Sequence, residues 1–307
     1  MTVNPALEAL LARAERVLAR LESTLPRPLE APDWDASVAF RYRRRAHAAL
    51  LDPVRHVGGI RLSDLQEIDG QRDRLVRNMA QFVAGAPANN VLLTGARGTG
   101  KSSLIKACLN EYADRGLRLI EVDKSDMVDL PDIVDLVGER AERFIIFCDD
   151  LSFEDGEPGY KALKSILDGS VSAASDNVLI CATSNRRHLL PEYMKDNLSY
   201  THTEDGEVHP GEVIEEKISL SERFGLWISF YPFSQDEYLA IVAQWLRQAG
   251  FDAAAIEAVR GEALVFALER GSRSGRVAWQ FARDMAGRRL VAGAGDMAGG
   301  NVIGGAA

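Results

Sequence analysis

The chain has 307 residues, 46% of them hydrophobic, and a formal net charge of −9 at pH 7. This length can bury a large α/β core and a smaller accessory domain, which excludes a small disulfide-stapled fold. The three cysteines lack the regular spacing of a secreted disulfide framework, and no apolar run approaches membrane-spanning length. We therefore expect a cytoplasmic protein with no membrane partner. The negative charge disfavours indiscriminate binding to nucleic acid.

Residues 1–60 form a predicted N-terminal helical region. From Leu7 to Leu25, leucine and alanine recur at alternating steps of four and three, which aligns one apolar stripe along a helix. Two interpretations stay open: a coiled-coil or partner-docking helix, and an arm that packs on its own domain. The arm is favoured because a coiled coil needs about three to four full heptads.

A basic stretch follows, in which Phe40 and Tyr42 are interleaved with arginines at positions 41, 43, 44 and 45. A nucleic-acid contact is one interpretation, because arginine neutralises phosphate and aromatic rings stack on bases. The favoured interpretation is the solvated face of a helix.

Residues 61–233 show the pattern of an α/β domain. A helix is predicted from Gln71 to Val83, with its apolar residues on one side. Short apolar runs separated by helical segments then occur at 91–94, 117–122, 144–148, 178–183 and 226–230. Runs this short and this continuously apolar indicate strands buried on both faces. We therefore predict a five-stranded parallel sheet flanked by helices.

The C-terminal part is expected to form a separate unit. Ser234 and Glu237 have the spacing of a capping box, and the pattern from there is helical to about Arg289. This predicts a helical lid over residues 234–290. Residues 291–307 are rich in glycine and alanine without periodicity, so we expect disorder there.

The segment GARGTGKS has the spacing of a phosphate-binding loop. It follows a predicted strand and opens a predicted helix, as that motif requires. Glycines let the backbone amides point inward at phosphates, Lys101 supplies a charge to the terminal phosphates, and the Ser102 hydroxyl can ligate Mg²⁺. We expect ATP to contact the whole loop, namely Gly95, Ala96, Arg97, Gly98, Thr99, Gly100, Lys101, Ser102 and Ser103.

Polar residues follow two later strands of the predicted sheet. FIIFCDD ends in Asp149, which suits a carboxylate beside Mg²⁺, and Asp150, which suits a general base that orients a water. The run VLICATSN ends in Asn185, whose amide can hydrogen-bond a terminal phosphate or that water. An ordinary turn or loop cap is the alternative at each position.

The order of these features resembles that of AAA+ ATPases, from about Leu62 to Arg289. More narrowly, the phrases PANNVLLTGARGTGKSSLIKA, FCDDLSF, ATSNRRHLLPE, SERFGLWISFYPF and GSRSGR resemble an uncharacterised bacterial family of AAA+-like ATP-binding proteins of unknown function. The resemblance implies a P-loop nucleotide-binding fold with a C-terminal helical lid.

The resemblance also implies roles for single residues. Lys101 and Ser102 would be the Walker A pair, Asp149 and Asp150 the Walker B pair, and Asn185 the first sensor. All would act on ATP and Mg²⁺.

Four more residues receive roles only from the resemblance. Arg223 would be the finger that reaches a neighbouring subunit's nucleotide, which implies a homo-oligomer. Arg276 would be the lid sensor on the nucleotide of its own chain. Ile68 and Gly70 are placed like the loop that clasps adenine.

One departure from the family pattern concerns the presumed base. AAA+ ATPases usually carry Asp-Glu at the end of the Walker B strand, whereas this chain has Asp149-Asp150. Aspartate is one methylene shorter, so we expect slow hydrolysis unless the backbone compensates; a misplacement of about 1 Å costs roughly 100-fold in rate. Glu154 is a candidate substitute, and Arg186 and Arg187 are rivals for the finger.

Residues 191–218 form a long acidic connection between two strands without a clear period. Loops of this length are usually functional or disordered. An acidic lid or client-contact loop and a mobile insertion are equally favoured interpretations.

Three functions follow from these observations. The leading one is a magnesium-dependent ATPase that couples ATP binding and hydrolysis to the remodelling of a macromolecular partner; we expect an unidentified protein client, and nucleic acid is possible but not favoured. The alternative is a nucleotide-gated scaffold that holds ATP and turns it over slowly or not at all. A DNA or helicase loader is disfavoured by the acidic charge.

Overall fold

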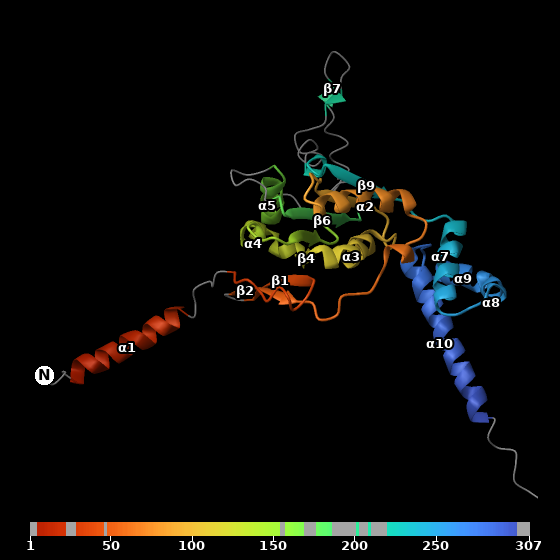
Figure 1. Cartoon of the computed structure of the whole chain (residues 1–307), viewed down its shortest axis with the longest axis horizontal. Coiled ribbons are helices and arrows are strands. Elements are labelled where there is room, and N and C mark those ends of the chain that lie inside the picture. The colour runs from red at the N-terminus through yellow and green to blue at the C-terminus, as the bar shows by residue number, and fades with distance from the viewer. Residues whose placement is uncertain are drawn as a thin grey trace, which may run out of the picture.

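The computed structural model describes residues 5–22, 29–45, 48–153, 157–168, 176–185, 201–202, 208–209 and 220–299. Its centre is a seven-stranded sheet in the order β2-β1-β4-β5-β6-β3-β9 (Figure 1). The strands are β1 Ala39–Arg45, β2 Ala48–Pro53, β3 Val91–Gly95, β4 Leu117–Glu121, β5 Arg143–Cys148, β6 Val178–Ser184 and β9 Leu226–Phe230. All neighbours pair in parallel except β1 and β2.

The five expected strands are present as β3, β4, β5, β6 and β9, but the expected strand count was wrong. An antiparallel hairpin of β1 and β2 extends the sheet beside β4. The basic stretch is thus a strand and no helix face, because Phe40 and Tyr42 alternate with arginines at the two-residue period of a strand. Both aromatic side chains are buried.

The arginines of β1 have acidic neighbours. Arg41 pairs with Glu121 at 2.7 Å, Arg44 lies 3.6 Å from Asp129, and Arg43 and Arg45 each lie 3.7 Å from Asp52, measured between nitrogen and oxygen atoms. Paired in this way, the guanidinium groups are partly neutralised. The nucleic-acid interpretation of this stretch loses its support.

Helices cover both faces of the sheet, as expected for strands buried on both sides. On one face lie α2 (Asp69–Val83) and α3 (Lys101–Tyr112), whose residues share a core with Val91 and Leu93 of β3. On the other lie α4 (Leu130–Val137) and α5 (Pro158–Leu167), which share a second core with Leu92. Short 3₁₀ helices η1 (Leu62–Asp64), η2 (Ala113–Arg115) and η3 (Lys124–Asp129) join these elements.

Four helices follow β9: α7 (Gln235–Gln248), α8 (Ala253–Ala258), α9 (Arg260–Glu269) and α10 (Gly275–Gly299). The capping box is present, since Ser234 Oγ accepts from Glu237 N at 3.2 Å and Glu237 Oε2 accepts from Ser234 N at 2.6 Å. Lid residues such as Leu246 and Phe281 belong to the core that contains α2 and α3. Helix α10 continues to Gly299, into the segment expected to be disordered.

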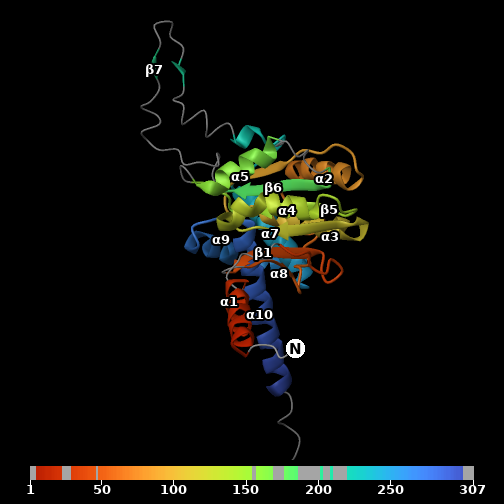
Figure 2. The same ribbon diagram turned by 90° about the vertical axis from the view of Figure 1, so that its left-hand side faces the viewer.

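The N-terminal helix is present as α1 (Pro5–Glu22) and extends away from the sheet (Figures 1 and 2). Half or more of the side-chain surface of Leu10, Leu11, Val17 and Leu18 is exposed. An arm packed on its own domain is therefore not what this structure contains. The partner-docking interpretation stays a prediction.

Within the acidic segment 191–218, only β7 (Thr201–His202) and β8 (Val208–His209) are described, and they pair antiparallel. The rest of that segment lies outside the described residues, as do Glu154, Arg186 and Arg187. Among the helices that the structure describes, none has the length and apolar character needed to cross a membrane.

Candidate functional site

The loop between β3 and α3 has a backbone that only glycine fits at two positions. Gly95 has φ +124°, and a Cβ there would lie 1.9 Å from the backbone oxygen of Phe230. Gly98 has φ +73°, and a Cβ there would lie 2.9 Å from the side chain of Ser274. The tight winding predicted from the glycine spacing is thus present, with β9 and the start of α10 packed directly against it.

Lys101 opens α3 beneath this loop, and its side chain is buried. Its Nζ donates to Gly95 O at 2.9 Å, to Ala96 O at 2.8 Å and to Asn185 Oδ1 at 3.1 Å. Burial lowers the pKa of Lys101, while the nearby Asp149 and Asp150 act in the opposite direction. The structure therefore brings Lys101 and Asn185 into direct contact.

The two aspartates at the end of β5 face different partners. Asp149 Oδ1 accepts from Ser102 Oγ and from Thr183 Oγ1, both at 2.6 Å. Asp150 accepts from the Asn185 amide and donates its own N–H to Thr183 Oγ1 at 3.0 Å. Thr183, on β6, holds both aspartates and was missed, because a threonine inside an apolar strand gives no sequence signal of its own.

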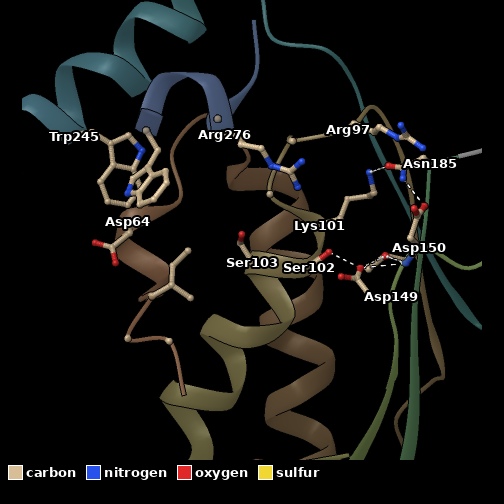
Figure 3. Close-up of a pocket in the computed structure, with 18 residues that line it drawn as sticks. Asp64, Arg97, Lys101, Ser102, Ser103, Asp149, Asp150, Asn185, Trp245 and Arg276 are labelled. Atoms are coloured by element: carbon tan, nitrogen blue, oxygen red, sulfur yellow. Dashed lines mark hydrogen bonds between the residues drawn. The ribbon is translucent and has the colours of Figure 1, made fainter. Parts of the chain in front are cut away.

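These residues lie at one end of a cavity of about 1060 Å³ (Figure 3). Asp64 and the lid residue Trp245 lie at the opposite end (Figure 3), and the lining also includes Gly58, Gly59, Ile60 and a second lid tryptophan, Trp279. One end is thus rich in charge and hydrogen-bonding groups, whereas the other offers two indole rings. A nucleotide has the same division, with a polar triphosphate and a flat apolar base.

At the end of the cavity opposite the aspartates, two amide side chains hold the backbone and Asp64 in place. Asn110 Nδ2 on α3 donates to Gly58 O and to Ile60 O, both at 2.8 Å. Gln248 Nε2 at the end of α7 donates to Asp64 Oδ1 at 2.9 Å, which links the lid to η1. Sequence reasoning missed this end; its signals were the Gly58-Gly59 pair and two tryptophans on lid helices.

Ile68 and Gly70 do not line the cavity. Ile68 is buried, and a Cβ built on Gly100 would lie 3.6 Å from Ile68 Cδ1, so Ile68 supports the phosphate-loop glycines from the core. Gly70 is exposed in the first turn of α2. The resemblance to AAA+ ATPases implied that both residues lie in a loop that clasps adenine. The structure places neither of them in the cavity.

The lid touches the phosphate loop directly. Gly275 N, at the start of α10, donates to Gly98 O at 2.8 Å. The next residue, Arg276, lines the cavity at its charged end (Figure 3). A displacement of the phosphate loop is therefore transmitted to the first turn of α10.

Arg223 lies outside the cavity and forms an ion pair with Asp168 at the end of α5. About a quarter of its side-chain surface is exposed. Arg223 is therefore not among the residues that line the cavity of its own chain.

The residues present fit a magnesium ion and a triphosphate. Mg²⁺ prefers oxygen ligands, and the hydroxyl of Ser102 lies beside the carboxylate of Asp149. The glycine conformations leave a backbone cradle in front of the N-terminus of α3, a favourable place for phosphate.

The sequence model of one family matches residues 35–289, and that family is described as proteins of unknown function (DUF815). The match covers the sheet and nearly all of the lid. No curated protein has a significantly similar sequence.

Several solved structures share features of the fold at low identity. A variant of RuvB from Thermotoga maritima has a TM-score of 0.49 and 15% identity, over 73% of this chain and 64% of the RuvB chain. Another, titled a Holliday junction branch migration motor, has a TM-score of 0.45 at 15% identity, over 73% and 63%. A chain of the HORMA:CdnC:Trip13 complex from E. coli MS115-1 has a TM-score of 0.46 at 13% identity, over 73% and 90%. This chain thus spans less than two thirds of the RuvB chains.

Proposed function

We propose a magnesium-dependent ATPase activity of AAA+ type for this chain, which belongs to the DUF815 family of proteins of unknown function. One observation carries the proposal: Lys101, Ser102, Asp149, Asp150 and Asn185 form a connected set of hydrogen bonds beneath a glycine loop. Strand, loop and helix stand in the order that a phosphate-binding loop requires.

Each residue of this set has a distinct task in the proposal. Ser102 and Asp149 would hold Mg²⁺, which supplies charge neutralisation across the terminal phosphates. Lys101 exchanges its bonds to the loop carbonyls for bonds to phosphate oxygens. Asn185 orients the attacking water beside Asp150.

Hydrolysis then needs one proton acceptor and one bond exchange. The water oxygen forms a bond to the terminal phosphorus, while the bond from that phosphorus to the bridging oxygen breaks. ADP leaves with the electron pair, and Asp150 accepts the proton of the water. The Asn185 amide, which donates to the Asp150 carboxylate, fixes the direction of that carboxylate.

The end of the cavity that carries Asp64 and the two tryptophans is here called the base end. Its side chains favour a nucleotide over a simple phosphate ester as the ligand. Trp279 and Trp245 offer flat apolar surface, and base stacking on an aromatic ring contributes about 1–3 kcal/mol. The Asp64 carboxylate can accept a hydrogen bond from an exocyclic amino group, which adenine carries. These groups would replace Ile68 and Gly70 as the adenine contacts.

We further propose that nucleotide state moves the lid and that the protein works as a homo-oligomer on a protein client. The direct bond from Gly275 N to Gly98 O supports lid coupling. The position of Arg223 outside its own cavity supports action in trans.

A slow or non-hydrolysing scaffold is the second candidate. The observation that favours it is Asp150 at a position where AAA+ ATPases usually carry glutamate. A protein that retains ATP unhydrolysed for hours would favour this candidate over the ATPase.

Calorimetry with Mg·ATP tests the common premise of both candidates. We expect saturable binding by the wild type that is lost in Lys101→Ala and weakened when Mg²⁺ is omitted. Binding that survives Lys101→Ala unchanged would contradict both. Phosphate release under the same conditions then separates the ATPase from the scaffold.

A further inference from the structure

Three cationic side chains line the cavity: Lys101, Arg276 and Arg97. Lys101 has a role in the proposed function and the resemblance to AAA+ ATPases implies one for Arg276, whereas Arg97 is so far assigned only to the phosphate-binding loop. Its side chain is exposed, and within the described part of the chain it has no hydrogen bond or ion pair. Figure 3 shows it beside Asn185, at the end of the cavity that holds both aspartates.

The backbone on both sides of Arg97 is fixed. Ala96 N donates to Phe230 O at 3.2 Å, and Ala96 O accepts from Thr99 Oγ1 at 2.8 Å. Gly98 O accepts from Gly275 N at 2.8 Å. Arg97 is thus an exposed side chain on a loop whose backbone is held on both sides, so it can reach over the cavity without any movement of the backbone.

The nearby carboxylates are already engaged. Asp149 accepts from Ser102 and Thr183, and Asp150 accepts from Asn185. Arg97, Arg276 and Lys101 line the same cavity, so their positive charges repel one another there. A multiply charged anion in the cavity would relieve this repulsion and give the Arg97 guanidinium its missing partner.

We propose that Arg97 is a catalytic residue that contacts the terminal phosphate of ATP from within its own chain. A guanidinium offers a planar fork of donors that matches phosphate oxygens, and it neutralises the charge on the phosphoryl group during transfer. The inference rests on the proposed function. It adds a second arginine in cis, beside Arg276, and makes Arg97 the group that distinguishes ATP from ADP.

The test compares Arg97→Gln with a matched control, Arg77→Gln, which removes an exposed charge from α2 outside the cavity. Calorimetry measures Kd for Mg·ATP and for Mg·ADP with each variant. We expect Arg97→Gln to weaken ATP binding by about 10- to 100-fold, the range for a hydrogen bond to a charged group, and to leave ADP binding within about twofold. The control should leave both unchanged.

A second variant separates geometry from charge. Arg97→Lys keeps the charge and loses the fork, so we expect an intermediate ratio of ADP to ATP affinity and a lower kcat at saturating ATP. Because Arg97 is exposed, both variants should unfold at the wild-type urea concentration.

Two results are distinguishable. If the wild type binds ATP through Lys101 but Arg97→Gln leaves the ratio of the two affinities unchanged, the assignment of Arg97 is wrong and the proposed function stands. If the wild type binds neither nucleotide, the proposed function fails, and the Arg97 assignment fails with it. The affinity ratio decides the question even for a protein that does not turn over.

Discussion

Asp150 has φ +51° at the end of β5, a left-handed conformation that costs a residue other than glycine roughly 1–2 kcal/mol. Aspartate is among the residues that tolerate it best. The turn aims the amide of Asp150 at Thr183 and its carboxylate at Asn185. Strain of this kind persists where the surrounding contacts enforce it, often at functional sites. Here it sets the direction of a side chain that is one methylene shorter than glutamate.

The substitution Asp150→Asn tests the role of this carboxylate. Asparagine has the same size and tolerates the same backbone conformation, but it cannot accept the proton of the attacking water. We expect kcat to fall by about 100-fold or more, with Kd for Mg·ATP within a few-fold of the wild type. Steady-state phosphate release and calorimetry measure the two quantities. Unchanged turnover would exclude Asp150 as the base.

The substitution Gly95→Ala tests the cradle at the level of stability. The new Cβ would lie 1.9 Å from Phe230 O and would also strain a φ of +124°. Gly116→Ala is the matched control, because its φ is +86° but nothing lies within 4 Å of the added atom. In urea denaturation we expect Gly95→Ala to lower the free energy of unfolding by roughly 1–3 kcal/mol more than Gly116→Ala. Equal losses would show that the close approach to β9 is unimportant.

At the scale of elements, α7 and α10 each bring one tryptophan to the base end of the cavity. The capping box at Ser234 sets the start of α7, and the contact of Gly275 with Gly98 sets the start of α10. Neither indole therefore depends on the lid closing to reach the cavity.

We expect Trp279→Ala to weaken Mg·ATP binding by about 1–3 kcal/mol, the contribution of one stacked base. The substituted side chain is 42% exposed, so the fold should survive. Magnesium tripolyphosphate, which has no base, should bind both proteins equally in the same calorimetric assay. A parallel loss of tripolyphosphate affinity would show that Trp279 acts on the loop rather than on the base.

For the whole molecule, the open question is whether one subunit completes the site of another. Mixing Arg223→Ala with Lys101→Ala tests it, since each variant alone lacks a different part of the proposed site. If Arg223 acts in trans, a mixed oligomer contains sites with an intact Lys101 and a neighbour's intact Arg223, so the mixture should regain activity that neither variant has. The control is to show that the two variants exchange subunits. If they do and the mixture is no more active than the separate variants, Arg223 has a structural role through its ion pair with Asp168.

The exposed face of α1 belongs to the same scale. Its apolar stripe was readable from the spacing of leucines, but whether that stripe packs on its own domain was not. The arm was favoured, and the structure instead leaves Leu11 and Leu18 more than half exposed. The spacing of leucines shows which side of a helix is apolar. Whether that side packs against the rest of the chain depends on the path of the segment that connects the helix to the sheet.

Local sequence patterns alone predict the phosphate loop, the five central strands, a helix at 71–83 and the capping box of α7; in the structure that helix begins two residues earlier, at Asp69. Each of these follows from the spacing of residues close together in the chain. Glycines indicate tight turns, short apolar runs indicate buried strands, and a polar pair indicates the start of a helix. Local spacing also places Lys101, Asp149 and Asn185 after three strands, but it is the sheet order β5-β6-β3 that makes those strand ends neighbours.

The hairpin of β1 and β2, the contacts of Thr183 and the residues at the base end of the cavity become apparent only in the folded chain. These depend on contacts between segments far apart in the chain, such as Asn110 with Gly58 or Gln248 with Asp64. A local sequence pattern carries no information about such pairs. The two residues of each pair stabilise the fold only once the folding of the sheet and the lid has brought them together.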